Sequence, residues 1–377
     1  MSEKDLGLKV LSRALLWRMG YTTRLNVPLR AYIPNEDGKK RAPQTYTDLD
    51  VLGYHLTGGS HLHATVVDCK TPSKRATERI FWTRGVADLV GADEAWVVRA
   101  KEPPPVTRQL SSRLKVSVLT EAQLHELIAL HPTSLPLDGY LARLFNKVQV
   151  ASAQKHFTSM DARLAPLLSF CQFDYFVNEP HENLFQLVAH VAAVGEHLDA
   201  MNPIHCALFF DLAWLQILAS VQAISHIRGA HVGDLDTGLR EYALGGQVRL
   251  QEKKNLAVLL RELAPQGAPP AEPFPQYYEA LRETVTRLFK KPAVTLETLR
   301  YAEVATATLV ANRRTRMRTV FGDAYDMLAA KLVGDVCSYL VSAARLDPEF
   351  RRMSSEVLTG ESDAGGDGAA PNPPSPG

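Results

Sequence analysis

The sequence predicts an α/β domain over residues 1–131, followed by an all-α helical bundle over residues 135–358. Two observations carry this prediction. Up to about residue 130, short apolar runs bounded by charges and prolines alternate with segments of helical period, whereas beyond Leu135 nearly every segment is amphipathic with helical period or wholly apolar. The 377 residues are 46 % hydrophobic, which supplies apolar mass for one large core or two ordinary ones.

The N-terminal elements follow in the order α-β-β-β-α-β-α-β-α. Apolar residues at helical spacing predict a helix over 4–19 that ends at Gly20. Extended runs are expected over 22–32, 45–56 and 61–70, then a helix over 73–90, strands over 95–100 and 115–119 with the third helix of that order between them, and a last helix that begins at Thr120. The last two strands alternate with helices, which is typical of a sheet covered on both faces.

The helical bundle is predicted from long apolar or amphipathic stretches over 183–197, 205–227 and 295–345. They are interrupted by Gly245-Gly246 and by a proline-rich segment over 265–275, and they indicate six to nine helices. Residues 359–377 are rich in Gly, Pro, Ser and Asp without apolar periodicity, so a disordered tail is expected there.

Charge and cysteine content narrow the class of protein. The chain has 42 Lys+Arg against 41 Asp+Glu, and the basic excess lies in the N-terminal third, which favours a polyanionic partner there. The 4 cysteines are scattered without a CxxC pair, so neither a disulfide scaffold nor a structural zinc site is expected. No run approaches the roughly 18–20 uncharged apolar residues of a bilayer span. We therefore expect a cytoplasmic protein with no membrane partner.

Two carboxylates and a lysine are expected to meet at one end of a β-hairpin. A three-residue loop, Gly58–Ser60, places Asp50 opposite Asp68, and the alternation of side chains along a strand puts Lys70 on the same face. A two-residue loop would instead send Asp50 to the opposite face. The hairpin register therefore decides whether these three groups form one site.

Facing carboxylates repel each other and lose solvation unless a cation lies between them. Mg²⁺, with Mn²⁺ as a substitute, suits carboxylate and water oxygens. Lys70 would position the attacking water or neutralise charge that develops on phosphorus. Asp50, Asp68 and Lys70 together predict a site for phosphodiester hydrolysis.

Asp50 followed by Asp68-Cys69-Lys70 resembles the PD-(D/E)xK signature of restriction-endonuclease-like nucleases, and the surroundings are similar to the Mrr-like and Holliday-junction-resolvase-like branch. The supporting pattern covers about the first 130 residues. It comprises Arg18-Met19-Gly20-Tyr21 at the end of the first helix, the strands Leu49–Leu52 and Thr65–Lys70, Arg84-Gly85, Gly91 to Val98, and Val116 to Thr120 leading into Gln123-Leu124.

This resemblance implies a restriction-endonuclease-like fold with a mixed central sheet, and a Mg²⁺-dependent endonuclease that acts on DNA in defence or DNA processing. Asp50 and Asp68 would hold the metal, the main-chain carbonyl of Cys69 would add a ligand, and Lys70 would assist the water. The family often carries an acid on the first helix, where this chain has Lys9, with only Glu3 or Asp5 further out.

Four basic residues follow the lysine strand and could contact backbone phosphates: Lys74, Arg75, Arg79 and Arg84. Alternatively, they form a solvated helix face. The helical region would then serve target recognition, regulation, or assembly with a second copy or another protein.

A second interpretation, of a different class, is a catalytically inactive nucleic-acid-binding or scaffold protein with the same fold. The intact set of Asp50, Asp68 and Lys70 favours the enzyme, whereas the missing acid on the first helix favours this alternative. His55 and His63 are expected on the face away from Asp50, and the histidines of the helical region are expected to be ordinary core or surface residues.

Overall fold

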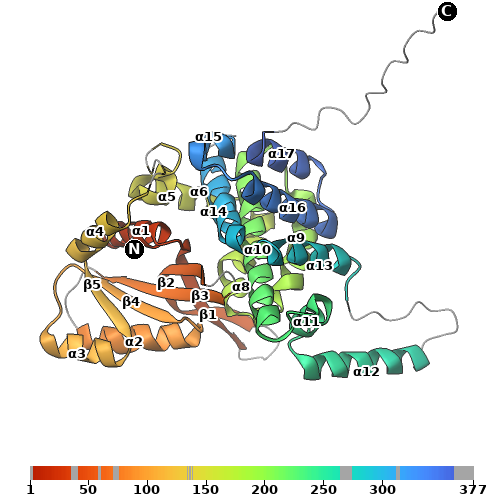
Figure 1. The fold of residues 1–377 in the computed structure, drawn as a ribbon, viewed down its shortest axis with the longest axis horizontal. Coiled ribbons are helices and arrows are strands. Elements are labelled where there is room, and N and C mark those ends of the chain that lie inside the picture. Colours follow the sequence, from red (N-terminus) through yellow and green to blue (C-terminus); the bar gives the residue numbers. More distant parts are fainter. Residues whose placement is uncertain are drawn as a thin grey trace, which may run out of the picture.

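The computed structural model describes residues 3–34, 41–57, 61–70, 76–133, 135, 137, 139–263, 274–310 and 315–360. A sheet with helices on both faces forms the N-terminal region, and the remainder of the described chain is helical (Figure 1). Most of the predicted tail, from residue 361 onward, lies outside the described residues.

The sheet has five strands in the order β1-β2-β3-β4-β5. Their bounds are β1 (Thr22–Pro34), β2 (Arg41–Thr57), β3 (His61–Lys70), β4 (Glu94–Arg99) and β5 (Val116–Thr120). The first three strands pair antiparallel, and β3, β4 and β5 pair parallel. The predicted mixed sheet is therefore confirmed.

Helices cover both faces of this sheet: α1 (Glu3–Arg18), α2 (Ala76–Leu89), α3 (Pro105–Arg113) and α4 (Glu121–Leu130). Figure 1 shows α1 and α4 on one side and α2 and α3 on the other. The α1 and α4 side packs Leu16 and Leu124 against Val51, Val67 and Val98. Alternate residues of β2 and β3, such as Leu52 and Val66, belong to the core on the opposite side.

The register of the β2–β3 hairpin is the predicted one, because Val51 pairs with Val67 and Thr57 pairs with His61. The loop residues 58–60 themselves lie outside the described residues. The Asp50 and Asp68 positions therefore share a face, as expected from period-two alternation.

The helical region surrounds one long apolar helix, α10. Its elements are α5 (Ala142–Phe145), α6 (Lys147–Thr158), α7 (Ala165–Ser169), α8 (Tyr175–Val177), α9 (Asn183–Val194), α10 (Pro203–Ala230), α11 (Leu235–Ala243), α12 (Gln247–Leu263), α13 (Tyr278–Phe289), α14 (Pro292–Leu309), α15 (Met317–Phe321), α16 (Met327–Ala344) and α17 (Glu349–Leu358), with short 3-10 turns at Ala162–Leu164, Gly195–His197 and Gly322–Ala324 and a π turn at Phe170–Asp174.

The predicted continuous stretch 295–345 is divided into α14, α15 and α16. Gly322 has a φ of 55° and ends α15, and the Asp326 carboxylate accepts hydrogen bonds from the N–H groups of Leu328 and Ala329 to begin α16. The sequence does carry signals for the second break, because Gly322 and the N-cap residue Asp326 interrupt the apolar pattern between Phe321 and Met327.

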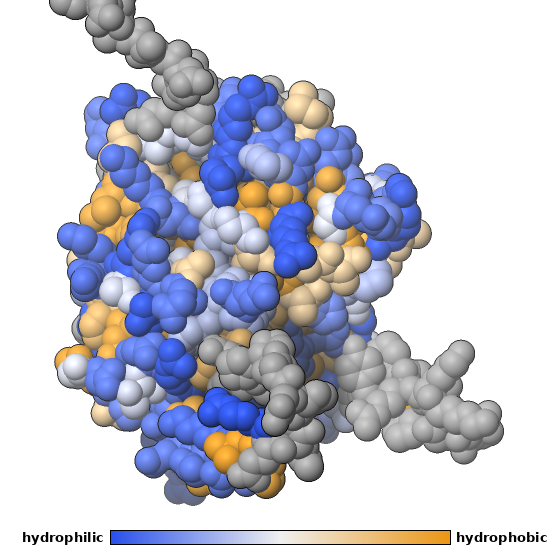
Figure 2. Space-filling model, turned by 90° about the vertical axis from the view of Figure 1, so that its right-hand side faces the viewer, coloured by the Kyte–Doolittle hydropathy of each residue, from blue (hydrophilic) through white to orange (hydrophobic). Residues whose placement is uncertain are grey.

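Within the described part of the chain, two helices, α10 and α16, are long and apolar enough to cross a membrane by length and composition. The most apolar window of α10 is 89 % buried inside the protein, and that of α16 is 56 % buried. Burial of this kind is what a core helix of a bundle shows. Figure 2 views the molecule from the helical side, where small apolar patches lie among hydrophilic side chains.

The two regions meet across a buried polar interface. Glu303 of α14 forms an ion pair with Arg13 of α1, with Nη2 and Oε1 2.6 Å apart, and accepts hydrogen bonds from Thr22 and Thr23 of β1. Trp214 of α10 donates its indole N–H to the Thr22 hydroxyl at 2.9 Å. The sheet is thereby fixed against the bundle by contacts between residues far apart in the chain.

Candidate active site

Asp50 and Asp68 lie near the ends of β2 and β3, and each is only 2 % exposed. The paired part of the two strands ends at Val51 and Val67. Beyond it, the N–H of Cys69 donates to Asp50 Oδ2 at 2.7 Å, so a carboxylate replaces the backbone acceptor of a regular ladder. This hydrogen bond fixes the Asp50 carboxylate between the two strands.

Lys70 completes the predicted set. Its Nζ atom lies 3.8 Å from Asp50 Oδ2, and its side chain is 36 % exposed, so it is reachable from solvent. Asp50 and Lys70 also act electrostatically on Asp68. The structure therefore brings the three predicted groups to one end of the hairpin.

The hairpin histidines lie on the reverse face, as predicted. His55 and His63 contact the ring of Tyr21, with ring centroids 5.1 Å and 6.4 Å apart. His63 also lies 3.6 Å from a carboxylate oxygen of Asp93. These histidines take no part in the candidate active site.

Lys9 of α1 is a member of the site that sequence reasoning missed. Its buried ammonium lies 2.7 Å from Asp50 Oδ1 and 3.6 Å from Asp48 Oδ2, and it donates to the side-chain oxygen of Asn26. Asn26 has a φ of 56°, a left-handed conformation that asparagine tolerates. Lys9 occupies the position on the first helix where the resemblance leads one to expect an acidic residue. A lysine at that position was the one feature of the sequence that could have pointed to its place in the site.

Arg79 of α2 holds the second carboxylate. Its guanidinium donates to both oxygens of Asp68 and stacks over Trp82, 3.7 Å from the ring centroid. Burial raises the pKa of the Asp68 carboxyl, and the Arg79 charge opposes that rise. The sequence predicted Arg79 as a phosphate contact, whereas in the structure it pairs with a site carboxylate.

The other three residues predicted to contact phosphates are Arg84, Lys74 and Arg75. Arg84 pairs with Asp88 one turn further along α2. Lys74 and Arg75 lie outside the described residues. Among the described residues, the basic face expected on this helix is thus reduced to two arginines that each have an acidic partner.

Cys69 presents its side chain and its main chain to different neighbours. The thiol is buried 3.6 Å from the Ser12 hydroxyl, and burial raises its pKa. Because the N–H and C=O of one strand residue point to the same side, the carbonyl of Cys69 faces β2, as its N–H does. The role of this carbonyl as a metal ligand stays a prediction.

The site borders a cleft of about 740 Å³ between the two regions. Lys9, Asp48 and Lys70 line it from the sheet side, and Phe157 and Val310 line it from the helices. Its volume is in the range of sites that hold small molecules.

Comparison with protein-family models, curated proteins and solved structures finds no match to this chain. What this arrangement can do must therefore be derived from its geometry and charge.

The donor atoms suit a hard divalent cation, since Asp50 and Asp68 offer carboxylate oxygens at the same end of the hairpin. The charges do not favour one in the free protein, because Lys9, Lys70 and Arg79 already balance Asp48, Asp50 and Asp68. Mg²⁺ in proteins is commonly held by one or two carboxylates together with substrate phosphates. A divalent cation at these residues would therefore need additional negative charge, such as that of a bound phosphodiester.

Proposed function

We propose that this chain is a metal-dependent nuclease that hydrolyses phosphodiester bonds, with DNA as the expected substrate. The observation that supports it is the convergence of Asp50, Asp68 and Lys70 at one end of the hairpin, beside the cleft between the two regions. The element order and the mixed sheet are those expected for the restriction-endonuclease-like fold.

Each residue has a defined task in this proposal. Asp50, Asp68 and the carbonyl of Cys69 would hold Mg²⁺ or Mn²⁺ in the presence of substrate. The ion, when bound, supplies positive charge to the phosphoryl group and activates a water. Lys70 orients that water and stabilises negative charge as it develops on the phosphoryl oxygens. Lys9 fixes Asp50, because its ammonium and the Cys69 N–H bind opposite oxygens of the carboxylate.

Arg79 would change partners when substrate arrives. Its side chain is 27 % exposed, whereas that of Asp68 is 2 % exposed, so the guanidinium is the member of the pair that solvent reaches. A backbone phosphate offers it a second bidentate anion. This exchange would free Asp68 for the metal and would give Arg79 the phosphate-binding role that the sequence predicts.

A second candidate function is a non-cleaving nucleic-acid-binding or scaffold protein. The specific observation in its favour is that Lys9 and Arg79 already compensate both carboxylates. In that case the two cations take the place of a metal, and the cleft binds phosphate without cutting it.

Incubation of the protein with supercoiled plasmid separates the two candidates. The nuclease converts plasmid to nicked or linear product with Mg²⁺ or Mn²⁺, and EDTA abolishes the conversion. A parallel incubation with RNA of mixed sequence reports the substrate class. Binding of plasmid without any cleavage in either metal would favour the second candidate.

Two variants guard against a contaminating nuclease. Asp68→Asn removes a proposed ligand and should abolish cleavage. Asp88→Asn removes an exposed carboxylate that pairs with Arg84 on the same helix and should leave cleavage unchanged. Equal cleavage by both variants would assign the activity to another protein.

The proposal also implies where the protein acts and what it binds. It would act in the cytoplasm on nucleic acid, and its helical region would recognise the target or assemble with a second copy or another protein.

A further inference from the structure

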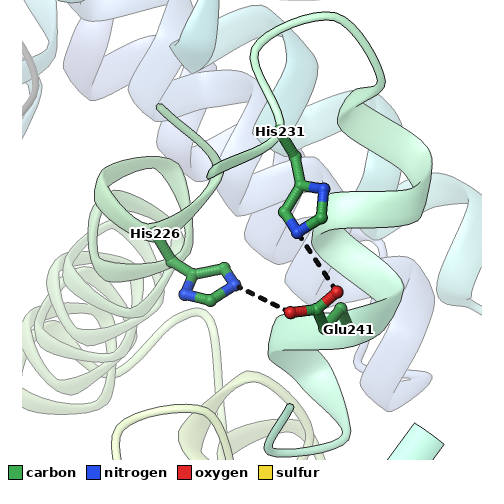
Figure 3. Close-up of side chains that lie close together, drawn as sticks. All are labelled: His226, His231 and Glu241. Atoms are coloured by element: carbon green, nitrogen blue, oxygen red, sulfur yellow. Dashed lines mark ion pairs between the residues drawn. The ribbon is translucent and has the colours of Figure 1, made fainter. Parts of the chain in front are cut away.

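A second group of chemistry-bearing side chains lies at the turn between α10 and α11, in the helical region. His226 lies on the last turns of α10, His231 ends that helix, and Glu241 lies on α11 (Figure 3). Nε2 of His231 is 3.1 Å from one carboxylate oxygen of Glu241, and Nε2 of His226 is 3.9 Å from the other. One ligand atom from each residue lies within 4.8 Å of the other two.

The three groups are partly withdrawn from water. The side chain of Glu241 is 17 % exposed, that of His231 is 22 % exposed and that of His226 is 35 % exposed. The Nε2 atom of His226 is itself buried and has no hydrogen-bond partner among the described residues. A buried ring nitrogen without a partner is costly unless something binds it.

The backbone of α11 is shaped to admit His231. A Cβ atom on Gly238 would lie 2.6 Å from Cβ of His231, so only glycine allows the helix to approach this closely. Gly238 therefore permits His231 and Glu241 to meet across the turn.

The three side chains are arranged so that a transition-metal ion would draw their ligand atoms slightly closer together. Metal bonds of about 2.0–2.1 Å in a tetrahedron place ligand atoms roughly 3.3–3.4 Å apart. The two Nε2 atoms lie 3.1 Å and 3.9 Å from different oxygens of Glu241, and one ligand atom from each residue lies within 4.8 Å of the other two, so rotation of the side chains around an ion would bring them to that value. Two imidazole nitrogens and one carboxylate oxygen suit Zn²⁺, and they leave one position for water or another ligand.

We propose that His226, His231 and Glu241 bind one Zn²⁺ ion that clips the end of α10 to α11. The inference is independent of the nuclease proposal, because none of these residues lies in the active site or its cleft. Without metal the same groups would form only imidazole–carboxylate ion pairs, and the experiment must separate these two states.

Zinc binding is measured on tag-free full-length protein, stripped with chelator and titrated with Zn²⁺ against a coloured metal indicator. We expect one equivalent of Zn²⁺ to bind tightly enough to compete with the indicator. Substitution with Co²⁺ should give the visible absorption of a tetrahedral nitrogen and oxygen site, a signal that an ion pair cannot produce.

Ligand variants locate the ion. His231→Ala and Glu241→Gln should each weaken Zn²⁺ binding by more than about 100-fold, since loss of an outer-shell partner alone costs 10–100-fold. His197→Ala is the matched control, because His197 also lies beside a glutamate but belongs to no group of three such ligands among the described residues. Circular dichroism of each variant verifies that the helices remain folded.

Three results would overturn the proposal. Wild-type protein that takes up no zinc under competition shows that the cluster is an ion pair only. Wild-type zinc binding retained by both folded ligand variants places the ion elsewhere. An equal loss in His197→Ala shows that binding is nonspecific. Glu241→Gln keeps the shape of the side chain, so its result remains decisive if His231→Ala fails to fold.

Discussion

At the scale of single residues, the electrostatics of the candidate active site depend on Lys9. It is buried beside an equally buried Asp50, and its ammonium lies 2.7 Å from the carboxylate. A buried ion pair adds little stability over apolar residues of the same shape, yet removal of one partner leaves an uncompensated charge. The pair is therefore best tested through the loss of one member.

Lys9→Met should lower the free energy of unfolding by about 3–5 kcal/mol, because Asp50 loses its buried partner and keeps only the more exposed Lys70, whose ammonium lies 3.8 Å away. Lys70→Met is the control. Its ammonium lies 3.8 Å from the same carboxylate but the side chain is 36 % exposed, so the loss should stay below about 1 kcal/mol. Urea unfolding of the two variants measures the difference between their free energies of unfolding. Equal losses of stability would show that Lys9 is not the main partner of Asp50.

The partial burial of His190 predicts that the stability of the protein depends on pH. Its ring stacks on Phe170 with centroids 4.3 Å apart, and burial lowers its pKa below the ordinary value of 6.5. The unfolded chain then binds the proton more readily, so this contribution is present above pH 6.5 and is lost as the pH falls through 6.5 toward the lower folded pKa. His190→Gln should unfold with a shallower pH dependence over this window in urea titrations. An unchanged slope would contradict the burial argument.

At the scale of elements, the packing of α1 on the hairpin places Lys9 over the site. Gly53 of β2 makes this approach possible, since a Cβ there would lie 3.1 Å from both Leu16 Cδ1 and Tyr21 Cδ1. Leu16 is fully buried and has little freedom to move.

Gly53→Ala should lower the free energy of unfolding by about 1–3 kcal/mol through overpacking against α1. Gly85→Ala in α2 should do the opposite, with a gain of about 0.5–1 kcal/mol, because no atom lies within 4 Å of its added Cβ and alanine favours helix. Denaturant midpoints of the two variants provide the measurement. A gain at Gly53 would mean that α1 is not closely packed there.

The hairpin shows what could be predicted at this scale. Side chains alternate strictly along a strand, so the loop length alone put Asp50, Asp68 and Lys70 on one face. The partners of Arg79 and of the histidines at the α10–α11 turn depend on how helices are oriented after they form. Periodicity specifies which face of a helix is apolar but not which neighbour that face meets, so these contacts could not be predicted.

At the scale of the whole molecule, the α/β and helical regions depend on each other. Glu303 binds Arg13, Thr22 and Thr23, which are about 280 residues away in the chain. The apolar core also runs without interruption from Trp17 and Tyr54 of the sheet region into α10. The pattern of apolar residues predicted the change from α/β to helical structure near residue 131. It did not predict that the two regions share this interface.

A fragment of residues 1–131 should therefore fail to unfold cooperatively, because it exposes the buried Trp17 and leaves Arg13 without Glu303. Thermal unfolding followed by circular dichroism compares the fragment with the full chain. A fragment that melts at the temperature of the full chain would show that the interface contributes nothing to the sheet region.

The central claim is that Lys70 acts with Asp50 and Asp68 in phosphodiester hydrolysis, and the rate of plasmid nicking by Lys70→Ala tests it most directly. The account predicts that wild-type protein nicks plasmid with Mg²⁺ and that the variant nicks about 10²–10³-fold more slowly, as expected for loss of a group that stabilises developing charge. Plasmid affinity should change little and keep its salt dependence, since the other basic groups remain. Equal nicking rates for the two proteins, or no nicking by the wild type, would contradict the claim.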